Sequence, residues 1–279
     1  MLAGVLGYPV AHSRSPAMMN AAFAELGLDW HYVKLPLPPE RFAETVRALP
    51  GSGYVGANVT IPHKLAACAL ADEHSDAARA IGAANTLTFA DGVIRADNTD
   101  AGGLLDALGE PVAGRTALVL GAGGAGRGVV WALREAGAEV AVWNRTTARA
   151  AALASELDVD VYAAPAPATR PGPVGAGAQE PRSGRSAPEI VVNATSVGLT
   201  AGVGLDVLPL DGLEPAIVVD MVYGAEPTPL CRWAGERGAR VVDGLEVLVR
   251  QGARSLELWT GCAAPVETMR RAAAQGHRV

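Results

Sequence analysis

Residues 116–126 read Thr-Ala-Leu-Val-Leu-Gly-Ala-Gly-Gly-Ala-Gly, an apolar run that passes directly into closely spaced glycines. The run Thr116–Leu120 is short, apolar and bounded by a glycine turn, which predicts a buried strand. The glycines at 121, 123 and 126 have the spacing G-x-G-x-x-G, and a helical pattern follows them to Ala136. A strand, a glycine turn and a helix in this order are typical of a dinucleotide-binding unit. The stretch therefore predicts a Rossmann-type fold, with an ordinary tight turn as the simpler alternative.

Each glycine of this motif has a separate predicted role. Gly121 permits the tight turn, Gly123 lets the backbone approach a pyrophosphate, and Gly126 permits close packing of the helix on the strand. The pyrophosphate would lie at the helix N-terminus, where free N–H groups and the helix dipole favour an anion. We therefore expect the whole turn to contact the cofactor, namely Gly121, Ala122, Gly123, Gly124, Ala125 and Gly126.

The end of the next predicted strand indicates which dinucleotide is bound. Glu139–Trp143 is that strand, and Asn144, Arg145 and Thr146 follow it, with Arg149 close behind. An NAD site usually carries Asp or Glu here, which bonds the ribose hydroxyls. Two guanidinium groups and a hydroxyl group suit a planar, multidentate contact with a 2′-phosphate instead. The pattern favours NADP, and a solvated helix start capped by a threonine is the alternative.

The composition describes a globular chain without a basic surface. Of its 279 residues, 49% are hydrophobic and 19% are charged, and the formal net charge is −6. This profile is unlike that of disordered chains, which are polar and rich in charge. An acidic chain also lacks the basic footprint that nucleic-acid binding requires. We therefore expect no nucleic-acid partner.

Cysteine and hydrophobic patterns bear on the compartment. The three cysteines, Cys68, Cys231 and Cys262, are too widely spaced for a disulfide framework or a local metal site. The five histidines are scattered too, so local spacing gives no metal site. No apolar run is long enough to span a membrane, and the apolar start at Met1–Val10 lacks the basic segment of a signal peptide. We expect a cytoplasmic protein without a membrane partner or a metal.

The pattern along the chain changes twice. Residues 1–101 alternate short strand-like and helical runs, which predicts a mostly parallel sheet covered on both faces. Residues 102–244 contain the glycine turn and further apolar strands, and residues 245–279 are mainly helical. The predicted fold class is therefore α/β. The later strands are expected at Ile190–Asn193, Ile217–Met221 and Arg240–Val242.

One segment interrupts the second of these regions. Residues 163–188 are rich in Pro, Ala, Gly and Arg and show no periodicity. This composition predicts a flexible surface excursion within the Rossmann region. Because it follows the residues expected at the adenosine side, we expect it to leave the chemistry intact.

Four polar clusters lie where predicted strands and helices end in the first region. Each has a purely structural explanation, because Ser15, Thr60 and Asp100 could be ordinary helix N-caps. Taken singly, that explanation is at least as good as a functional one. The clusters are His12–Pro16, Asn58–Lys64, Ala84–Thr86 and Asp97–Asp100.

Taken together and in order, these clusters resemble the shikimate dehydrogenase family. The resemblance continues through the glycine turn and extends over nearly the whole chain. So many matching segments in one order make a chance similarity improbable. The segments are SRSP (13–16), NVTIPHK (58–64), AANT (83–86), DNTD (97–100), GAGGAGRG (121–128), NRT (144–146), NATSVG (193–198), DMVY (220–223) and DGLEVLVRQ (243–251).

The resemblance implies an enzyme that reduces 3-dehydroshikimate to shikimate with NADPH, in the pathway to aromatic amino acids. It implies that Lys64 and Asp100 form the proton-handling pair, since the cofactor supplies only a hydride. Lys64 is expected to be the main donor, although the division of the role within the pair stays open. The residues implied for substrate binding are Ser13, Ser15, Asn58, Thr60, Asn85, Tyr223 and Gln251, where Tyr223 could instead pack only beside the nicotinamide.

Further cofactor contacts and the domain plan follow from the same resemblance. A substrate domain of residues 1–101, completed by the helices of 245–279, would join a Rossmann domain of residues 102–244. The protein would act as a monomer or a homodimer. Besides the glycine turn, the cofactor would contact Asn144, Arg145, Thr146, Arg149, Thr195, Met221 and Gly244.

Two alternatives stay open. A quinate/shikimate dehydrogenase that prefers NAD would share most of these segments, but Ser15 favours shikimate and Arg145 favours NADP. A non-catalytic NADP-binding regulator on the same fold would be expected to lack Lys64 or Asp100. Both residues are present.

Overall fold

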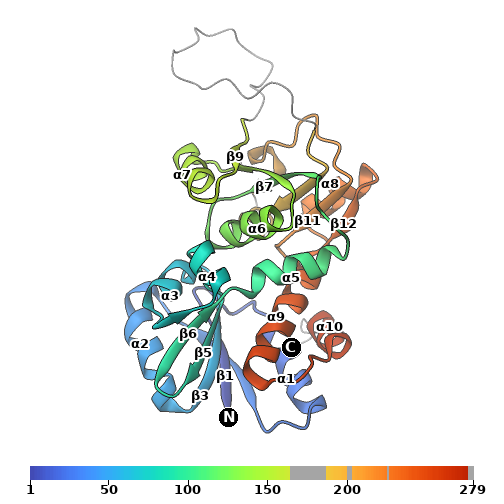
Figure 1. Cartoon of the computed structure of the whole chain (residues 1–279). Helices are drawn as coiled ribbons and strands as arrows, with labels where there is room; N and C mark the ends of the chain where they lie inside the picture. Colours follow the sequence, from blue (N-terminus) through green and yellow to red (C-terminus); the bar gives the residue numbers. More distant parts are fainter. Residues whose placement is uncertain (164–186, 200–202, 225, 276–279) are drawn as a thin grey trace.

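The computed structural model describes residues 1–163, 187–199, 203–224 and 226–275. Its strands form two six-stranded sheets, which lie in separate lobes in Figure 1. Helices alternate with these strands along the chain, so the predicted α/β class is confirmed. Most of the excursion expected at 163–188 lies outside the described residues. Within the described ranges, no helix is both long enough and apolar enough to cross a membrane.

The first sheet has the strand order β2-β1-β3-β5-β6-β4. Strand β1 pairs in parallel with β2 and β3, whereas β5 runs antiparallel to both β3 and β6. The sheet is therefore more mixed than the strand–helix alternation predicted. Its strands are β1 (Leu2–Gly7), β2 (His31–Pro36), β3 (Tyr54–Val59), β4 (Glu73–His74), β5 (Thr86–Ala90) and β6 (Val93–Asp97).

The antiparallel part is a hairpin that our sequence interpretation missed. Asp91 and Gly92 close it, with positive φ angles of 55° and 76°. Two-residue hairpin turns need such angles, and an Asp-Gly pair between alternating strands is a strong signal for them. The hairpin matters for function because it pairs Thr86 with Asp97. It thereby brings two of the polar clusters to the same end of the sheet.

The second sheet has the order β12-β11-β10-β7-β8-β9, and all its pairs are parallel. With β7 as the first strand, this is the Rossmann order, and ligands bind beyond the carboxyl ends of the strands where the winding reverses. Here that point lies between β7 and β10. The strands are β7 (Thr116–Leu120), β8 (Glu139–Trp143), β9 (Asp160–Val161), β10 (Ile190–Asn193), β11 (Ile217–Asp220) and β12 (Arg240–Val242).

The last two helices return to the first lobe. Helices α9 (Gly244–Thr260) and α10 (Val266–Gln275) lie beside α1 (Ser15–Glu25) in Figure 1. Met18 and Met269 are fully buried in the core that these helices share with β1. The end of the chain therefore forms one wall of the first lobe.

Helix α5 (Thr99–Leu108) links the two sheets and packs closely on α9. A β-carbon at Gly103 would lie 2.6 Å from the backbone nitrogen of Gln251, so only glycine permits this approach. The contact brings the side chain of Gln251 towards the start of α5. The remaining helices are α2 (Phe42–Ala48), α3 (Lys64–Leu70), α4 (Asp76–Ile81), α6 (Gly124–Glu135), α7 (Thr147–Leu157) and α8 (Pro229–Glu236), with short 3-10 turns at Pro39–Arg41, Pro50–Ser52 and Leu205–Val207.

Glu246 ties the two C-terminal helices together. Its Oε2 accepts from Nε of Arg270 at 2.8 Å, and its Oε1 accepts from Nη2 of Arg270 at 2.9 Å and Nε of Arg250 at 2.7 Å. The hydrogen bonds from Arg270, followed by those from Arg250, lower the pKa of Glu246 below its ordinary value. The charged carboxylate is thus stabilised in the folded protein.

We predict that Glu246→Gln lowers the free energy of unfolding at neutral pH by about 1 kcal/mol, because charge-assisted bonds to a group one-quarter exposed are lost. A pKa lowered by folding gives stability that is fully present above the unfolded value, about 4.3, and is lost below it. The difference between wild type and variant in urea denaturation should therefore shrink as the pH falls below 4.3. Glu44→Gln, at a carboxylate 76% exposed, is the control and should change little. A difference that stayed constant down to acid pH would refute this account.

Candidate active site

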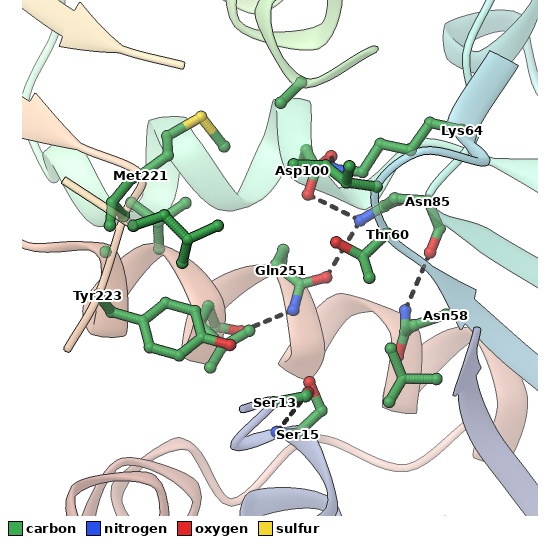
Figure 2. A pocket seen from close by; sticks show the side chains of 18 of the residues that line it. Ser13, Ser15, Asn58, Thr60, Lys64, Asn85, Asp100, Met221, Tyr223 and Gln251 are labelled. Carbon is green, nitrogen blue, oxygen red and sulfur yellow. Dashed lines mark hydrogen bonds and ion pairs between the residues drawn. The ribbon is translucent and has the colours of Figure 1, made fainter. Parts of the chain in front are cut away.

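A cavity lies between the two lobes, beyond the carboxyl ends of strands from both sheets (Figure 2). Residues that follow β1 and β3 form one side, and residues that follow β10 and β11 form the other. In both sheets the winding reverses beside a strand whose carboxyl end faces this cavity, as expected for a ligand site. The structure brings together all the residues predicted for catalysis and substrate binding, namely Ser13, Ser15, Asn58, Thr60, Lys64, Asn85, Asp100, Tyr223 and Gln251.

Three of these residues had a simpler explanation as helix caps, and the structure contradicts it. Helices α1 and α3 begin without a side-chain cap bond. Helix α5 is capped by Asn98, whose side chain accepts from a backbone N–H of the first turn. Ser15, Thr60 and Asp100 are therefore not caps, and all three line the cavity.

Lys64 and Asp100 form a nearly buried ion pair. Their Nζ and Oδ2 atoms are 2.5 Å apart, and the two side chains are 12% and 7% exposed. Asn85 donates from Nδ2 to the other carboxylate oxygen of Asp100 at 2.9 Å, and to Oε1 of Gln251 at 3.0 Å. Both oxygens of Asp100 thus accept a hydrogen bond, and Figure 2 shows the group around Asn85. The arrangement holds one carboxylate and one ammonium group at a fixed place on the cavity wall.

A layer of buried polar side chains holds this group from behind. The hydroxyl of Tyr32 donates to Oδ1 of Asn58 at 2.8 Å, and Nδ2 of Asn58 donates to Oγ of Ser255 at 2.8 Å. Oγ of Ser255 also lies 2.9 Å from Oγ1 of Thr86 and 3.1 Å from Oγ1 of Thr99. Among the described residues, every buried side-chain nitrogen or oxygen has a hydrogen-bond partner. A complete network of this kind fixes the side chains that face the cavity.

Our sequence interpretation missed several residues of this site. Ser255 lies one helical turn after Gln251, and a polar residue on the apolar face of α9 was the available signal. Ser196 follows β10, whose carboxyl end could have been recognised as a ligand position. The other cavity-lining residues that we did not predict are Val5, Val10, His12, Val59, Ile61, Ala194, Leu199, Val222, Val247 and Leu248.

A second cavity adjoins the first and follows the glycine turn. Lys64, Ala125 and Thr195 line both cavities, so the ion pair lies at their junction. Met221 and Gly244, which we had predicted for the cofactor, line the first cavity instead of the second. The other predicted cofactor residues that line the second cavity are Gly121, Ala122, Gly123, Gly124, Asn144, Arg145, Thr146 and Arg149.

The geometry of the turn suits a pyrophosphate. Gly121 has a φ angle of 113°, and a β-carbon on Gly126 would lie 2.0 Å from the carbonyl oxygen of Gly121. Gly126 lines neither cavity, so its role is close packing within the turn. No heavy atom lies within 4 Å of the position that a β-carbon on Gly123 would take, so this side of the turn is open. Beyond it begins α6, whose first N–H groups favour an anion.

Gly124 sets how closely the turn approaches the ion pair. A β-carbon at this position would lie 2.8 Å from Cβ of Lys64, which belongs to the other lobe. Such a contact is shorter than van der Waals packing allows, so a larger residue would push the lobes apart. The glycine therefore lets the helix N-terminus and Lys64 share one narrow space.

The far rim of the second cavity carries the guanidinium groups. Arg145, Thr146 and Arg149 are exposed there. Asn144 connects this rim with the glycine turn, since its Oδ1 accepts from the backbone N–H of Ala122 at 3.2 Å. Thr146 occupies the N-cap position of α7 but makes no side-chain cap bond, so capping does not account for its hydroxyl group. The rim can therefore present two cations and a hydroxyl group to an anionic ligand.

Comparison with known families gives three matches along the chain. Residues 5–87 match the shikimate dehydrogenase substrate binding domain, and residues 105–166 match the shikimate/quinate 5-dehydrogenase family. Residues 244–274 match the shikimate 5′-dehydrogenase C-terminal domain. These ranges include three of the four polar clusters, the glycine turn and helix α9, while the cluster Asp97–Asp100 lies between the first two ranges.

Individual relatives cover nearly the whole chain. The shikimate dehydrogenase (NADP(+)) of Anaeromyxobacter dehalogenans is 45% identical over 97% of this chain and 95% of its own. The enzyme of the same name from Methanopyrus kandleri is 43% identical over 96% of this chain and 93% of its own. A crystal structure of Thermus thermophilus shikimate 5-dehydrogenase in complex with NADP(H) and shikimate matches with a TM-score of 0.82 and 39% identity, over 99% of both chains. The chain belongs to the shikimate dehydrogenase family.

Proposed function

We propose that this protein reduces 3-dehydroshikimate to shikimate with NADPH, a reversible step of aromatic amino acid biosynthesis. The observation that carries the proposal is the position of Lys64, which pairs with Asp100 and lines both cavities. A proton donor at this junction lies beside a polar cavity on one side and a glycine turn on the other. Membership of the family supports the same reaction.

The first cavity suits a small ring that carries hydroxyl groups and a carboxylate. Its polar lining consists largely of hydroxyl and amide groups, which donate and accept hydrogen bonds without adding charge. Ser13, Ser15 and Tyr223 lie near the N-terminus of α1, where free N–H groups favour an anion. We therefore place the carboxylate with these three residues and assign the hydroxyl groups of the substrate to Asn58, Thr60, Asn85 and Gln251.

Reduction of the ketone needs a hydride and a proton. Bound NADPH supplies the hydride. Lys64 is placed to donate the proton to the carbonyl oxygen, and Asp100 holds the ammonium group in position at 2.5 Å. Asn85 keeps the carboxylate of Asp100 from turning, because it occupies the second oxygen at 2.9 Å. In the reverse direction the same pair would take the proton from the hydroxyl group of shikimate.

NADP fits the second cavity for two reasons. The turn is open at Gly123 and tight at Gly126, which suits a pyrophosphate. The rim carries Arg145 and Arg149 and no carboxylate among its described lining residues, which favours a 2′-phosphate over free ribose hydroxyls. We assign Thr146 to the same phosphate.

The domain plan is part of the proposal. Residues 1–101 with 245–279 would form the substrate domain, and residues 102–244 would form the Rossmann domain. The return of α9 and α10 to the first lobe supports this division. We further propose a cytoplasmic enzyme that acts as a monomer or homodimer. Its three cysteines are free, as expected in a reducing compartment.

One absorbance assay separates this function from its alternatives. Purified protein should oxidise NADPH with 3-dehydroshikimate and reduce NADP+ with shikimate faster than with quinate. Faster reduction of NAD+ than of NADP+, together with turnover of quinate, would identify the broader quinate/shikimate activity. Tight binding of NADPH without any turnover would identify a regulator and refute the proposal.

We predict that Lys64→Ala lowers kcat by roughly 100- to 10,000-fold, because the proton donor is lost. The KM for shikimate should change only a few-fold, since most polar groups of the cavity remain. The matched control is Lys34→Ala, at an exposed lysine whose Nζ donates to the backbone of Ala11 outside both cavities. Steady-state kinetics of the three proteins decide the matter, and near-normal turnover of Lys64→Ala would remove this residue from the chemistry.

We predict that Arg145→Ala raises the dissociation constant of NADPH by roughly 10- to 100-fold, because a charge-assisted bond to the 2′-phosphate is lost. The dissociation constant of NADH should change by less than about threefold, since that ligand has no such phosphate. Titration of protein fluorescence with each nucleotide measures both values. Arg41→Ala serves as the control, because this exposed arginine pairs with Glu44 outside the cavity. Equal weakening of NADPH and NADH would place the phosphate elsewhere.

A further inference from the structure

Arg14 is a buried cation that the mechanism does not use. The residue is 6% exposed, and it lies between two serines of the cavity wall, at the N-cap position of α1. Its Nη2 donates to the carbonyl oxygen of Gly224 at 2.5 Å, and its Nη1 donates to that of Ala273 at 3.3 Å. Both acceptors are neutral, and no ion pair among the described residues includes Arg14.

An arrangement of this kind costs free energy. A buried charge is stabilised well only by an opposite charge together with hydrogen bonds, and carbonyl groups alone offset part of the desolvation. The positive charge of Arg14 therefore meets no carboxylate among the described residues, although the net charge of the chain is −6. Such a group is best explained by a negative charge that arrives with a ligand.

Arg14 does not reach the cavity itself, but the groups around it do. Ser13 and Ser15, on either side of it, line the cavity. Its Cζ atom lies 5.7 Å from the ring centroid of Tyr223, within the range of a cation–π contact. Tyr223 also lines the cavity. Tyr223 thus connects the buried guanidinium with the cavity, and the two serines that line the cavity flank Arg14 in the chain.

These hydroxyl groups are suited to donate to an anion. Burial raises the pKa of Tyr223, while hydrogen bonds with the Arg14 backbone and the Ser13 side chain partly oppose that rise. The phenol therefore stays protonated at neutral pH and remains a donor. A hydroxyl group that donates to a carboxylate is strengthened by a positive charge behind it, because the local dielectric is low.

The other cations of the cavity are already compensated or weakly charged. Lys64 is paired with Asp100 at 2.5 Å. His12 also lines the cavity, but burial and the neighbouring Lys34 lower its pKa, so its neutral form predominates at neutral pH. Arg14 is therefore the cation best placed to balance an anion bound at the serine end.

We propose that Arg14 is the counter-charge of the substrate carboxylate, and that it acts through the hydroxyl groups of Ser13, Ser15 and Tyr223. It is a positioning residue, because no atom of its side chain lines the cavity. The inference rests on the proposed function in taking shikimate as the ligand. The bond to Gly224 adds a second effect, since it holds the segment that carries Tyr223 after β11 against the first lobe.

The effect of the Arg14 charge on the carboxylate can be separated from the effect of its bond to Gly224 by comparing two ligands. Shikimate carries the carboxylate, whereas its methyl ester has the same ring and no charge. The kcat/KM of each is measured with NADP+ on the full chain, and their ratio reports discrimination for the charge. Arg14→Met removes the charge and the donors, Arg14→Gln removes the charge but keeps a donor for Gly224, and Arg14→Lys keeps the charge.

We predict that Arg14→Met and Arg14→Gln lower kcat/KM for shikimate by roughly 10- to 100-fold, as loss of a buried counter-charge implies. The kcat/KM for the methyl ester should change by less than about threefold, so the ratio of kcat/KM for shikimate to kcat/KM for the ester falls. Arg14→Lys should restore most of the ratio. The effect should appear mainly in the KM for shikimate, with little change in kcat.

Arg127→Met is the matched control. This guanidinium also links the two lobes, donating from Nε to the carbonyl oxygen of Ile81 at 2.6 Å, but it is paired with Glu156 and lines neither cavity. Its loss should lower Tm and leave the ratio of the two ligands unchanged.

Two outcomes would overturn the inference. One is an unchanged ratio in Arg14→Met and Arg14→Gln, which would leave Arg14 as a mechanical link only. The other is an equal fall of the ratio in Arg127→Met, which would attribute the effect to loosened lobes. Failure of the wild type to oxidise shikimate would instead refute the proposed function, so the two failures are distinguishable. Should Arg14→Met not fold, the neutral Arg14→Gln variant decides the question.

Discussion

The ion pair of Lys64 and Asp100 constrains the structure around it. Two charges that are 12% and 7% exposed are costly to remove from water, and the cost is offset only when each remaining polar atom is also paired. Residues from several elements of the first lobe provide the hydrogen bonds that the ion pair needs. The β5–β6 hairpin brings Asn85 beside Asp100, and the glycine at 103 lets α9 approach until Gln251 reaches Asn85. The hairpin and the two helices thus form a support for one carboxylate.

The second lobe is fitted to the same pair from the opposite side. Of the glycines in its turn, Gly121 and Gly126 permit the tight backbone, whereas Gly124 accommodates Cβ of Lys64. One short motif therefore serves two purposes, a tight turn and a contact between the lobes. This explains how a lysine of the first lobe can line the cavity of the second.

The sequence was sufficient to predict those elements whose structure depends on residues close to one another in the chain. Strands β7 and β8 follow from short apolar runs and glycine spacing, and the structure has them as predicted. The Asp91-Gly92 hairpin was equally local and was overlooked, so the first sheet was expected to be more parallel than it is. Tyr32 and Arg14 could not have been found in this way, and neither could the hydrogen-bond partners of Ser255. Ser255 meets Asn58 across 197 residues of chain, and nothing beside Arg14 in the sequence shows that its charge is buried.

An acidic chain that binds two anions must place its positive charge locally, and the two cavities do so differently. At the rim of the second cavity, Arg145 and Arg149 are exposed, so their attraction for a phosphate is screened by salt. Beside the first cavity the charge of Arg14 is buried next to the ring of Tyr223, where screening is weak and a low dielectric strengthens its field. The exposed arginines are free to change their rotamers with a ligand, whereas the buried one is held in place by Gly224 and Ala273. Net charge therefore says little about ligand charge here, because burial decides how far each cation acts.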